Sequence, residues 1–355
     1  MKFVTILFCS AALAFADGPS KIKSDETVMI YPAAGWQETS VENRIAWRVP
    51  IQLRVFEQRS SLLFSGLFQT VFGLDAKEMT AGERRLYNQR LGLFLADNQS
   101  QKRVLLKVGA HEVLMPATQQ NGWAETNLLI ELPASVGPQT LPVQVAPEWT
   151  DGRSFTGAVF LLAPTGYLVI SDIDDTIKIS NVADRKELLK NTLCRPFKPV
   201  PGMAGLYRSW QRTNVCFFYL SASSWQLFEP LREFIQTHGF PYGPFHMKRW
   251  SLTDHGFSEL WKSPEIYKRQ ALDEIISRFP RLQLVLVGDT GEKDPEVYGA
   301  LAREHPDKVR RIYLRNVTGE SAESPRIQSA LREVMKERWR LFDKPEELAS
   351  DIWNR

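Results

Sequence analysis

The spacing of apolar positions changes part-way along the chain, near residue 164. Before that point the apolar runs are short, partly alternate with polar residues and are separated by Gly, Pro and Asn, which is typical of antiparallel strands in a sandwich. These runs lie at residues 51–56, 104–108, 128–132, 143–145 and 158–162. The pattern predicts a β-sandwich-like N-terminal domain over residues 24–164.

A helix-like segment interrupts this β pattern. Thr80 and Glu83 have the spacing of a capping box, in which each side chain accepts a hydrogen bond from the backbone of the other residue. Residues 84–94 follow with a helix-like composition. We therefore expect a capped helix inside an insertion over residues 60–97.

Beyond Gly166 the apolar runs are too uniform for half-exposed strands, and helix-period segments separate them. The runs lie at residues 167–171, 215–220, 282–287 and 309–314. Apolar positions with helical spacing at 227–235 and 272–279 end at Gly239 and Pro280. This alternation predicts an α/β domain with a parallel sheet over residues 165–320.

The last segment, residues 321–355, is expected to form a helical tail. Within it, residues 327–341 have the spacing of a basic amphipathic helix. A helix packed on the domain, with solvated Arg and Lys side chains, is favoured over a strip that binds a membrane.

Length and charge narrow the function classes. A chain of 355 residues suggests two domains of ordinary size. Its formal net charge is only +3, so no strong overall field attracts nucleic acid or a membrane. We expect no nucleic-acid partner, and any anionic partner must bind at a local patch.

The first sixteen residues have the pattern of a secretory signal peptide. Lys2 precedes an apolar stretch, and Ala14 and Ala16 have the spacing of a cleavage site. The alternative is a retained membrane anchor. We expect an exported protein, periplasmic or secreted, in which an oxidising compartment would permit Cys194 and Cys216 to pair. Because Cys216 lies in an apolar run, a free thiol is the favoured expectation.

Polar residues follow the ends of three predicted parallel strands. They are residues 171–176, 221–224 and 288–294. Functional groups of an open parallel sheet collect beyond the carboxyl ends of its strands. These three segments therefore contain the candidate site.

Three aspartates in the first of these segments predict a metal site. Asp172, Asp174 and Asp175 repel one another unless a cation neutralises them. Mg²⁺ prefers one or two carboxylates, which Asp172 and Asp289 would supply from neighbouring strands. In an extended segment Asp172 and Asp174 project to one side and Asp175 to the other, so Asp175 is expected to have a structural role.

A carboxylate beside a metal ion can attack phosphorus and form an acyl-phosphate, which water then hydrolyses. Asp172 would be this nucleophile, and Asp174 would protonate the leaving alcohol and then activate the water. This role requires a raised pKa at Asp174, to which the nearby Asp172 would contribute. Taken alone, the Asp-x-Asp-x-Thr pattern is equally consistent with a turn or a calcium loop.

Ser221 and Lys268 extend the candidate site. Ser221 directly follows an apolar run and offers a hydroxyl to a phosphate oxygen, although a serine there is often only a cap. Lys268 lies one helical turn before Leu272, where a charge is out of place unless it reaches an anion. The alternatives are a side chain that extends to solvent and the use of Lys262 as the cation instead.

Together these motifs resemble a known superfamily. Residues 172–176, Ser221, Lys268 and Gly288-Asp289 followed by Asp294 match in order and spacing the four motifs of the haloacid dehalogenase superfamily of phosphohydrolases. The surrounding residues resemble the catalytic domain of the actin-patch-associated phosphatidate phosphatases and their bacterial relatives. The resemblance spans residues 161–316 and fades in the β-rich part.

The resemblance implies a Rossmann-like core and assigns roles within it. Asp172 would be the nucleophile and Asp174 the acid and base, while Thr176, Ser221 and Lys268 would contact the substrate phosphate. Mg²⁺ would be held by the Asp172 side chain, the Asp174 backbone carbonyl and Asp289, supported by Asp294. The family's eukaryotic members act inside the cell, so their physiological role does not extend to an exported chain.

The short inserts between the motifs leave room for only a minimal cap. An open site suits a bulky phosphate at a membrane surface, and the resemblance implies phosphatidate, which would give diacylglycerol, as the substrate. The alternatives are soluble phosphomonoesters or phosphoproteins, and a non-catalytic surface-binding protein on a phosphatase scaffold. Several inserted aromatic residues are candidates for acyl-chain contacts, or else for ordinary core positions: Phe197, Trp250, Phe257 and Trp261.

Overall fold

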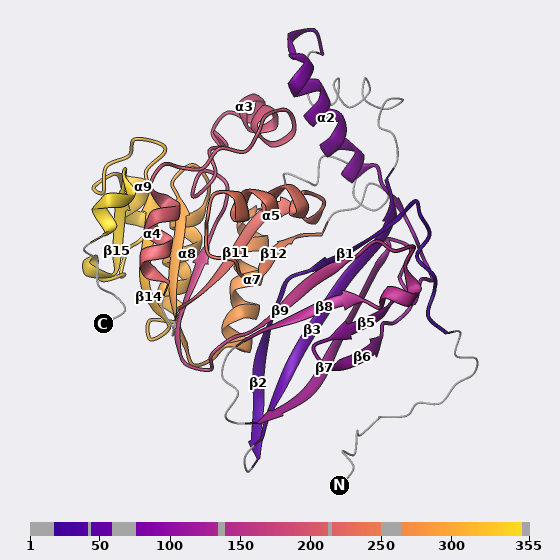
Figure 1. Ribbon diagram of the computed structural model, residues 1–355. Coiled ribbons are helices and arrows are strands. Elements are labelled where there is room, and N and C mark those ends of the chain that lie inside the picture. Colours follow the sequence, from indigo (N-terminus) through magenta and orange to yellow (C-terminus); the bar gives the residue numbers. More distant parts are fainter. Residues whose placement is uncertain are drawn as a thin grey trace.

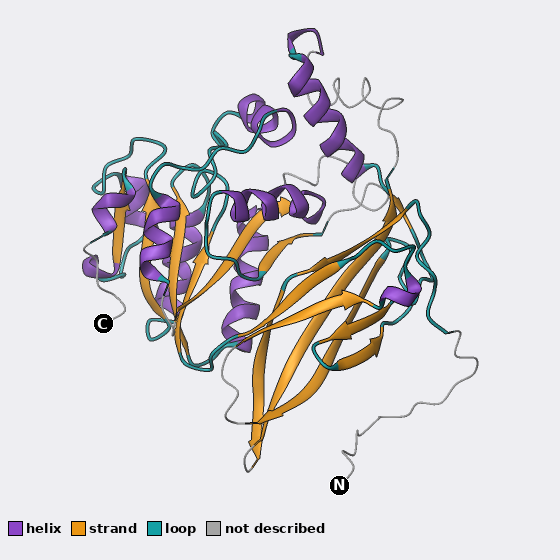
Figure 2. Cartoon of the chain, viewed as in Figure 1, coloured by secondary structure: helices purple, strands orange, loops and turns teal. Residues whose placement is uncertain are grey.

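The computed structural model describes residues 18–41, 44–58, 76–133, 139–211, 215–249 and 264–349. These residues form an α/β structure with two sheets, one of nine strands and one of six (Figure 1). The first sheet comes from the N-terminal half, and helices flank the second (Figure 2). The positions of the two sheets in the chain agree with the change in hydrophobic pattern near residue 164.

The nine-stranded sheet has the order β1-β3-β2-β9-β8-β5-β6, and β4 and β7 also pair with β3. All of its pairings are antiparallel except that of β2 with β9. Its strands are β1 (Glu26–Tyr31), β2 (Ala33–Val41), β3 (Arg44–Glu57), β4 (Asp97–Asn98), β5 (Leu105–Val108), β6 (His111–Leu114), β7 (Trp123–Pro133), β8 (Gln139–Val145) and β9 (Thr156–Leu161). The five predicted runs overlap β3, β5, β7, β8 and β9, whereas no predicted run covers β1, β2, β4 or β6.

One hydrophobic core lies inside this sheet. Alternate residues of β3, including Trp47, Val49 and Ile51, are buried because successive side chains of a strand point to opposite faces. They share a cluster with Leu106 of β5 and Val143 of β8. Strands from different parts of the strand order therefore contribute side chains to one core. A sandwich topology is consistent with this arrangement and stays a prediction.

Helix α2 (Ala81–Phe94) confirms the predicted capped helix. The Thr80 hydroxyl accepts a hydrogen bond from the Glu83 backbone N–H (3.2 Å), and the Glu83 carboxylate accepts one from the Thr80 backbone N–H (2.9 Å). Two first-turn N–H groups are satisfied in this way. The rest of the insertion, residues 60–75, lies outside the described residues.

The six-stranded sheet is parallel throughout and has the order β12-β11-β10-β13-β14-β15. Its strands are β10 (Gly166–Ser171), β11 (Val215–Ser224), β12 (Phe245–Lys248), β13 (Leu282–Asp289), β14 (Val309–Arg315) and β15 (Trp339–Phe342). The helices of this half are α3 (Arg185–Leu189), α4 (Met203–Trp210), α5 (Phe228–Thr237), α7 (Pro264–Arg278), α8 (Asp294–Glu304) and α9 (Pro325–Ala330). A π-helical turn, η3 (Lys190–Cys194), continues α3.

Alternate residues of the parallel strands pack into two different cores. Val169 of β10 lies in a cluster with Met203 of α4 and Leu231 of α5. Ile170, the next residue, lies in a second cluster with Leu272 of α7. Because neighbouring residues of a strand face opposite ways, α4 and α5 cover one face of the sheet and α7 covers the other. This layered arrangement confirms the predicted α/β parallel sheet.

The prediction of a helix over residues 327–341 is wrong. Helix α9 ends at Ala330, and Glu333 has a left-handed backbone (φ 62°) that a continuing helix does not permit. Strand β15 then pairs with β14 and buries Trp339 and Phe342. Pairing the edge of the sheet and burying two large side chains outweigh the helical spacing of the segment.

Several expectations fall outside what the structure tests. Residues 1–16 lie outside the described residues, so the signal peptide stays a prediction, as do the domain boundaries. Within the described residues, no helix combines the length and apolarity that crossing a bilayer requires.

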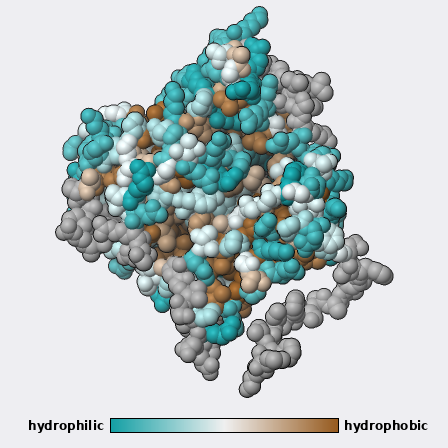
Figure 3. All heavy atoms as spheres, in the orientation of Figure 1, coloured by the Kyte–Doolittle hydropathy of each residue, from teal (hydrophilic) through white to brown (hydrophobic). Residues whose placement is uncertain are grey.

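Cys194 and Cys216 are free thiols on separate elements, η3 and β11. On the face shown in Figure 3, hydrophilic and hydrophobic residues are interspersed.

Aromatic side chains join the two sheets. Tyr31 of β1 stacks on Trp123 of β7, with ring centroids 4.6 Å apart and an interplanar angle of 15°. Its ring also lies 4.6 Å from Trp225 and 5.4 Å from Phe228, between β11 and α5. This contact fixes the N-terminal sheet against the parallel-sheet half beside the strand ends.

Removing the central ring should destabilise the whole chain. We expect Tyr31→Ala to lower the free energy of unfolding by about 3–5 kcal/mol, because a buried aromatic side chain is replaced by a cavity. Urea denaturation followed by circular dichroism measures this change. Leu129→Ala, at a side chain that is 56% exposed, should change it by less than about 0.5 kcal/mol. Equal effects of the two substitutions would contradict the assignment of Tyr31 to the joint.

Candidate active site

The carboxyl ends of two central strands bring distant aspartates together. Ser171 at the end of β10 pairs with Val287 of β13, so Asp172 and Asp289 leave the sheet at the same edge. Asp294, at the start of α8, joins them. One carboxylate oxygen from each of the three lies within 4.8 Å of the others, and all three residues are buried. The predicted convergence of Asp172 and Asp289 is therefore present.

Asp172 is held by contacts on both of its carboxylate oxygens. Oδ1 lies 3.0 Å from the Nζ of Lys268. Oδ2 accepts a hydrogen bond from the Thr176 hydroxyl at 3.1 Å, and the backbone N–H of Asp172 donates to the Val287 carbonyl at 2.9 Å. The side chain thus has a fixed orientation before any ligand binds.

Lys268 of α7 is a buried cation at the centre of the cluster. Its side chain is 2% exposed. Its Nζ lies 2.5 Å from Asp294, 2.8 Å from Glu292 and 3.0 Å from Asp172. Burial lowers the pKa of Lys268, but these three carboxylates raise it well above its usual range, so the amine stays charged. The alternative in which Lys268 reaches solvent is wrong, and Lys262 lies outside the described residues.

The two carboxylate oxygens of Asp289 differ in their hydrogen bonding. Oδ1 accepts hydrogen bonds from the backbone N–H groups of Gly291 (2.6 Å) and Glu292 (3.2 Å). Oδ2 is buried and has no hydrogen-bond partner among the described residues. An unpaired buried carboxylate oxygen is costly unless a cation or water contacts it. Asp289 is therefore suited to bind a metal ion through Oδ2.

The cluster contains more negative than positive charge. Burial raises the pKa of Asp172 and of Asp289 well above their usual range, and the neighbouring carboxylates, including Asp294 and Glu292, raise them further. The ammonium of Lys268 opposes this effect and lowers both pKa values. Such an excess of buried oxygen ligands fits a hard divalent cation such as Mg²⁺. Sequence reasoning missed Glu292, although it lies inside the third polar segment.

Asp174 does not share the environment of Asp172. Its carboxylate lies 2.6 Å from the Nζ of Lys178 and accepts hydrogen bonds from the hydroxyls of Ser180 (2.6 Å) and Ser223 (3.0 Å). Burial raises the pKa of Asp174, but Lys178 and the hydrogen bonds lower it by more, and the net shift is downward. The expectation of a raised pKa is therefore wrong for this structure, because it left out Lys178.

Asp175 has the structural role that its direction suggested. Its backbone is left-handed (φ 55°). Its carboxylate accepts hydrogen bonds from the backbone N–H groups of Ser180 (2.8 Å), Asn181 (2.9 Å) and Val182 (2.6 Å). Asp175 thus closes the loop that carries Lys178 and Ser180 back to Asp174.

Ser221 lies at the same sheet edge but does not line the pocket described below. It is fully buried, and its hydroxyl accepts a hydrogen bond from the Ser223 backbone N–H at 3.0 Å. Ala222, Ser223 and Ser224 contribute to the pocket wall instead. The Ser221 contact is that of a cap, and its role toward phosphate stays a prediction.

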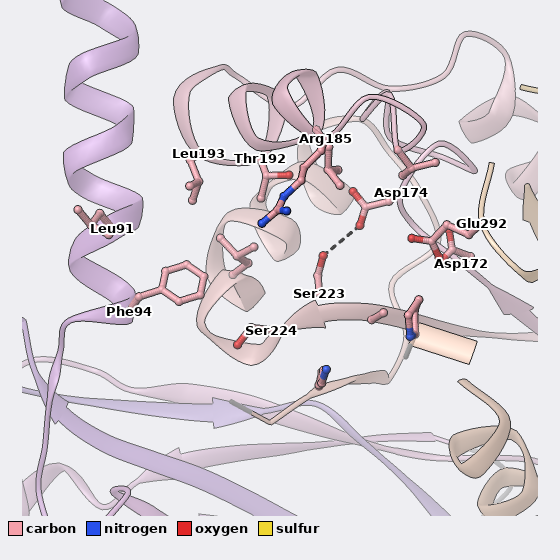
Figure 4. Close-up of a pocket in the computed structure, with 16 residues that line it drawn as sticks. Leu91, Phe94, Asp172, Asp174, Arg185, Thr192, Leu193, Ser223, Ser224 and Glu292 are labelled. Atoms are coloured by element: carbon pink, nitrogen blue, oxygen red, sulfur yellow. Dashed lines mark hydrogen bonds between the residues drawn. The ribbon is translucent and has the colours of Figure 1, made fainter. Parts of the chain in front are cut away.

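A pocket of about 280 Å³ opens beside the two catalytic candidates. Asp172, Asp174 and Glu292 line one end, and Leu91 and Phe94 of α2 line the other (Figure 4). Arg185 of α3 also lines it, and Figure 4 shows its guanidinium inside the pocket. Sequence reasoning did not place Leu91, Phe94 or Arg185 at the site, because their positions beside Asp172 depend on how α2 and α3 pack.

The aromatic candidates for acyl contacts have a mixed outcome. The Phe197 ring lies beneath two cations, 3.9 Å from the Arg90 guanidinium carbon and 4.8 Å from the Lys178 Nζ. Phe197 therefore contacts side chains next to the site, but it does not line the pocket. Trp250, Phe257 and Trp261 lie outside the described residues.

Comparison with known proteins finds a similarity over the segment that contains this site. Residues 167–316 match the family model described as the catalytic domain of phosphatidate phosphatase APP1. This match covers less than half of the 355-residue chain. The match contains β10, β11 and β13, and with them every predicted site residue from Asp172 to Asp294.

Two relatives carry the same similarity. Phosphatidate phosphatase APP1 of Saccharomyces cerevisiae is 34% identical over 180 residues, which cover 50% of this chain and 30% of that protein. An uncharacterized protein of Schizosaccharomyces pombe is 26% identical over 169 residues, covering 46% and 27%. The matched part thus spans less than a third of each relative. A solved chitinase, ChiW from Paenibacillus, aligns with a TM-score of 0.16 and 9% identity over 84% of this chain and 27% of that one, too low to indicate a shared fold.

The raised pKa values of Asp172 and Asp289 predict a pH-dependent effect of Mg²⁺. A carboxyl group whose pKa is higher in the folded than in the unfolded state contributes stability at low pH that is lost as the pH rises. A bound cation offsets this loss because it favours the ionised carboxylates. We therefore expect Mg²⁺ to raise the melting temperature more at about pH 8 than at about pH 5.

Thermal unfolding in EDTA and in Mg²⁺ at both pH values measures the effect. Asp289→Asn should remove most of the Mg²⁺-dependent shift, whereas Asp307→Asn, on an exposed turn, should keep it. A shift of equal size at both pH values would contradict the charge balance described here.

Proposed function

We propose that this chain is a Mg²⁺-dependent phosphatase that hydrolyses a phosphomonoester, most directly phosphatidate, through an aspartyl-phosphate at Asp172. One observation carries the proposal: Asp172 is buried at a sheet edge with Lys268 on one oxygen and two further aspartates within reach. The match of residues 167–316 to a phosphatase catalytic-domain family supports it.

The carboxylates of Asp172, Asp289 and Asp294 would hold the ion, with Asp289 Oδ2 as the ready ligand. The backbone carbonyl of Asp174 would complete the set that the resemblance implies. When bound, Mg²⁺ would neutralise the carboxylates and the substrate phosphate oxygens and make the phosphorus more electrophilic. All remaining steps belong to residues of the chain.

Asp172 would attack the phosphorus and form the acyl-phosphate, while the bond from phosphorus to the leaving alcohol breaks. Asp174 would give its proton to that alcohol. The present pKa of Asp174 is low because Lys178 lies beside it. A bound phosphate dianion near Asp174 would raise that pKa and favour the protonated form. In the second step the Asp174 carboxylate would take a proton from water as the water attacks the phosphorus, the bond between phosphorus and the Asp172 oxygen breaks, and phosphate and the free Asp172 carboxylate are released.

Lys268 would change partners during this cycle. Its ammonium now pairs with Asp172, Glu292 and Asp294. A phosphoryl group on Asp172 would bring its oxygens to the same ammonium, which would stabilise the charge that develops on them. Thr176 and Ser221 would supply hydroxyls at the same edge of the sheet.

Phosphatidate is the proposed substrate because the pocket next to Asp172 is apolar at its far end. The yeast relative is named for this activity. The haloacid dehalogenase-type Rossmann-like core with a minimal cap, the domain boundaries, action at a membrane surface as a peripheral protein, and export through residues 1–16 belong to the same proposal.

Asp172→Asn is the sharpest test of the chemistry. We expect it to lower the rate of phosphate release by about 10³-fold or more, because the amide is a poor nucleophile, while the circular dichroism spectrum stays unchanged. Malachite-green assays on phosphatidate in mixed micelles with Mg²⁺ measure the rate. The matched control is Asp273→Asn, which changes a largely exposed carboxylate of α7 and should keep the native rate. Unchanged phosphate release by the Asp172 variant would disprove this nucleophile.

A further inference from the structure

The pocket beside Asp172 is built by two distant parts of the chain. Its polar end belongs to the matched catalytic domain, but Leu91 and Phe94 at its apolar end come from α2. Helix α2 lies outside residues 167–316, so the match to the family model does not include these two residues. The apolar end therefore depends on a feature of this chain's own N-terminal half.

Helix α2 is anchored firmly against the catalytic half. The guanidinium of Arg90 donates hydrogen bonds to the backbone carbonyls of Thr192 (2.7 Å) and Arg195 (2.8 Å), at the end of η3. Cations are favourable at that end of a helix because its last carbonyls lack partners. Arg90 also lies 3.9 Å over the Phe197 ring. These contacts fix α2 as part of the pocket wall.

Apolar side chains continue this anchor toward the pocket. Tyr87 and Leu91 of α2 pack with Leu189 and Leu193 of the α3–η3 segment in one small buried core. Leu91 and Phe94 are three residues apart and share a helix face. Figure 4 shows the Phe94 ring extending from α2 toward the other residues that line the pocket. Phe94 is only partly buried, so part of its ring is available to a ligand.

We propose that the apolar wall of the pocket, formed by Leu91 and Phe94 of α2 and by Leu188 and Leu193 of the α3–η3 segment, binds the glycerol backbone and first acyl carbons of a lipid phosphomonoester whose phosphate lies at Asp172. The substrate class rests on the proposed function. The occupant follows from continuity, because the same cavity touches Asp172 and Asp174 at one end and these apolar side chains at the other. A molecule that fills it must have a phosphate joined to an apolar group.

The size of the cavity limits how much of the lipid it holds. At about 280 Å³ it is slightly smaller than the pockets that usually enclose small ligands, ~300–1,000 Å³. A phosphate, a glycerol and the first methylenes fit this volume, whereas two complete acyl chains exceed it. The rest of each chain stays in the micelle or bilayer, and Phe94 is then a specificity-determining residue and not a catalytic one.

A comparison of two phosphate esters tests the proposal. Dioctanoyl phosphatidate and glycerol 3-phosphate share the phosphate and glycerol, but only the first has acyl carbons. We expect Phe94→Ala to lower the ratio of their kcat/KM values by about ten-fold or more, because losing apolar contacts in a pocket costs binding of the apolar group. Leu93→Ala is the matched control, because Leu93 lies on α2 but does not line the pocket, and it should keep the native ratio.

A binding measurement separates this proposal from the proposed function. Titration calorimetry with dioctanoyl phosphatidate in EDTA, where turnover is not expected, should show about ten-fold weaker binding for Phe94→Ala than for the native chain or Leu93→Ala. If the native chain hydrolyses neither ester but this binding difference is found, the wall is supported and the phosphatase proposal fails. If the native chain is active while Phe94→Ala changes neither the ratio nor the binding, the wall proposal is overturned and the phosphatase proposal stands.

Discussion

The structure depends on one electrostatic constraint, the burial of more carboxylates than a single ammonium can neutralise. Lys268 contacts Asp172, Glu292 and Asp294, while one carboxylate oxygen of Asp289 has no hydrogen-bond partner in the described part of the chain. Folding a chain around such a cluster is costly unless a further cation or protons balance it. The folded chain therefore has uncompensated negative charge at the sheet edge where the proposed phosphate would bind. A divalent cation bound there would neutralise this charge and would contact both the nucleophile Asp172 and the substrate phosphate.

The backbone around the cluster is shaped to permit this crowding. A side chain at Gly288 would place its Cβ 2.3 Å from an oxygen of Asp294, so only glycine allows that carboxylate to approach the strand. The Asp294 carboxylate in turn accepts a hydrogen bond from the Asp289 backbone N–H at 3.2 Å. Asp294 thus orients two groups, the end of β13 and the ammonium of Lys268. These contacts explain why Asp294 is buried although it lies at the start of a helix.

The sequence was sufficient for the features that depend on local order along the chain. Uniform apolar runs predicted the parallel strands, and the strand-end rule placed Asp172 with Asp289. Sequence reasoning failed where contacts between residues distant in the chain decide the structure or the pKa. The pKa of Asp174 depends on Lys178, which a closed loop returns to it, and β15 forms because the sheet edge offers a partner. The α2 wall was also missed, because no local pattern shows that Arg90 reaches the carbonyls of η3.

Crystals grown with Mn²⁺, which replaces Mg²⁺ at oxygen-ligand sites and scatters anomalously, give the most direct test. An anomalous difference map locates the ion without assumptions about activity. We expect one strong peak in contact with the carboxylates of Asp172 and Asp289, with Oδ2 of Asp289 among the ligands. The proposed metal site is contradicted if these carboxylates bind no ion at saturating Mn²⁺ and Asp172 stays paired with Lys268.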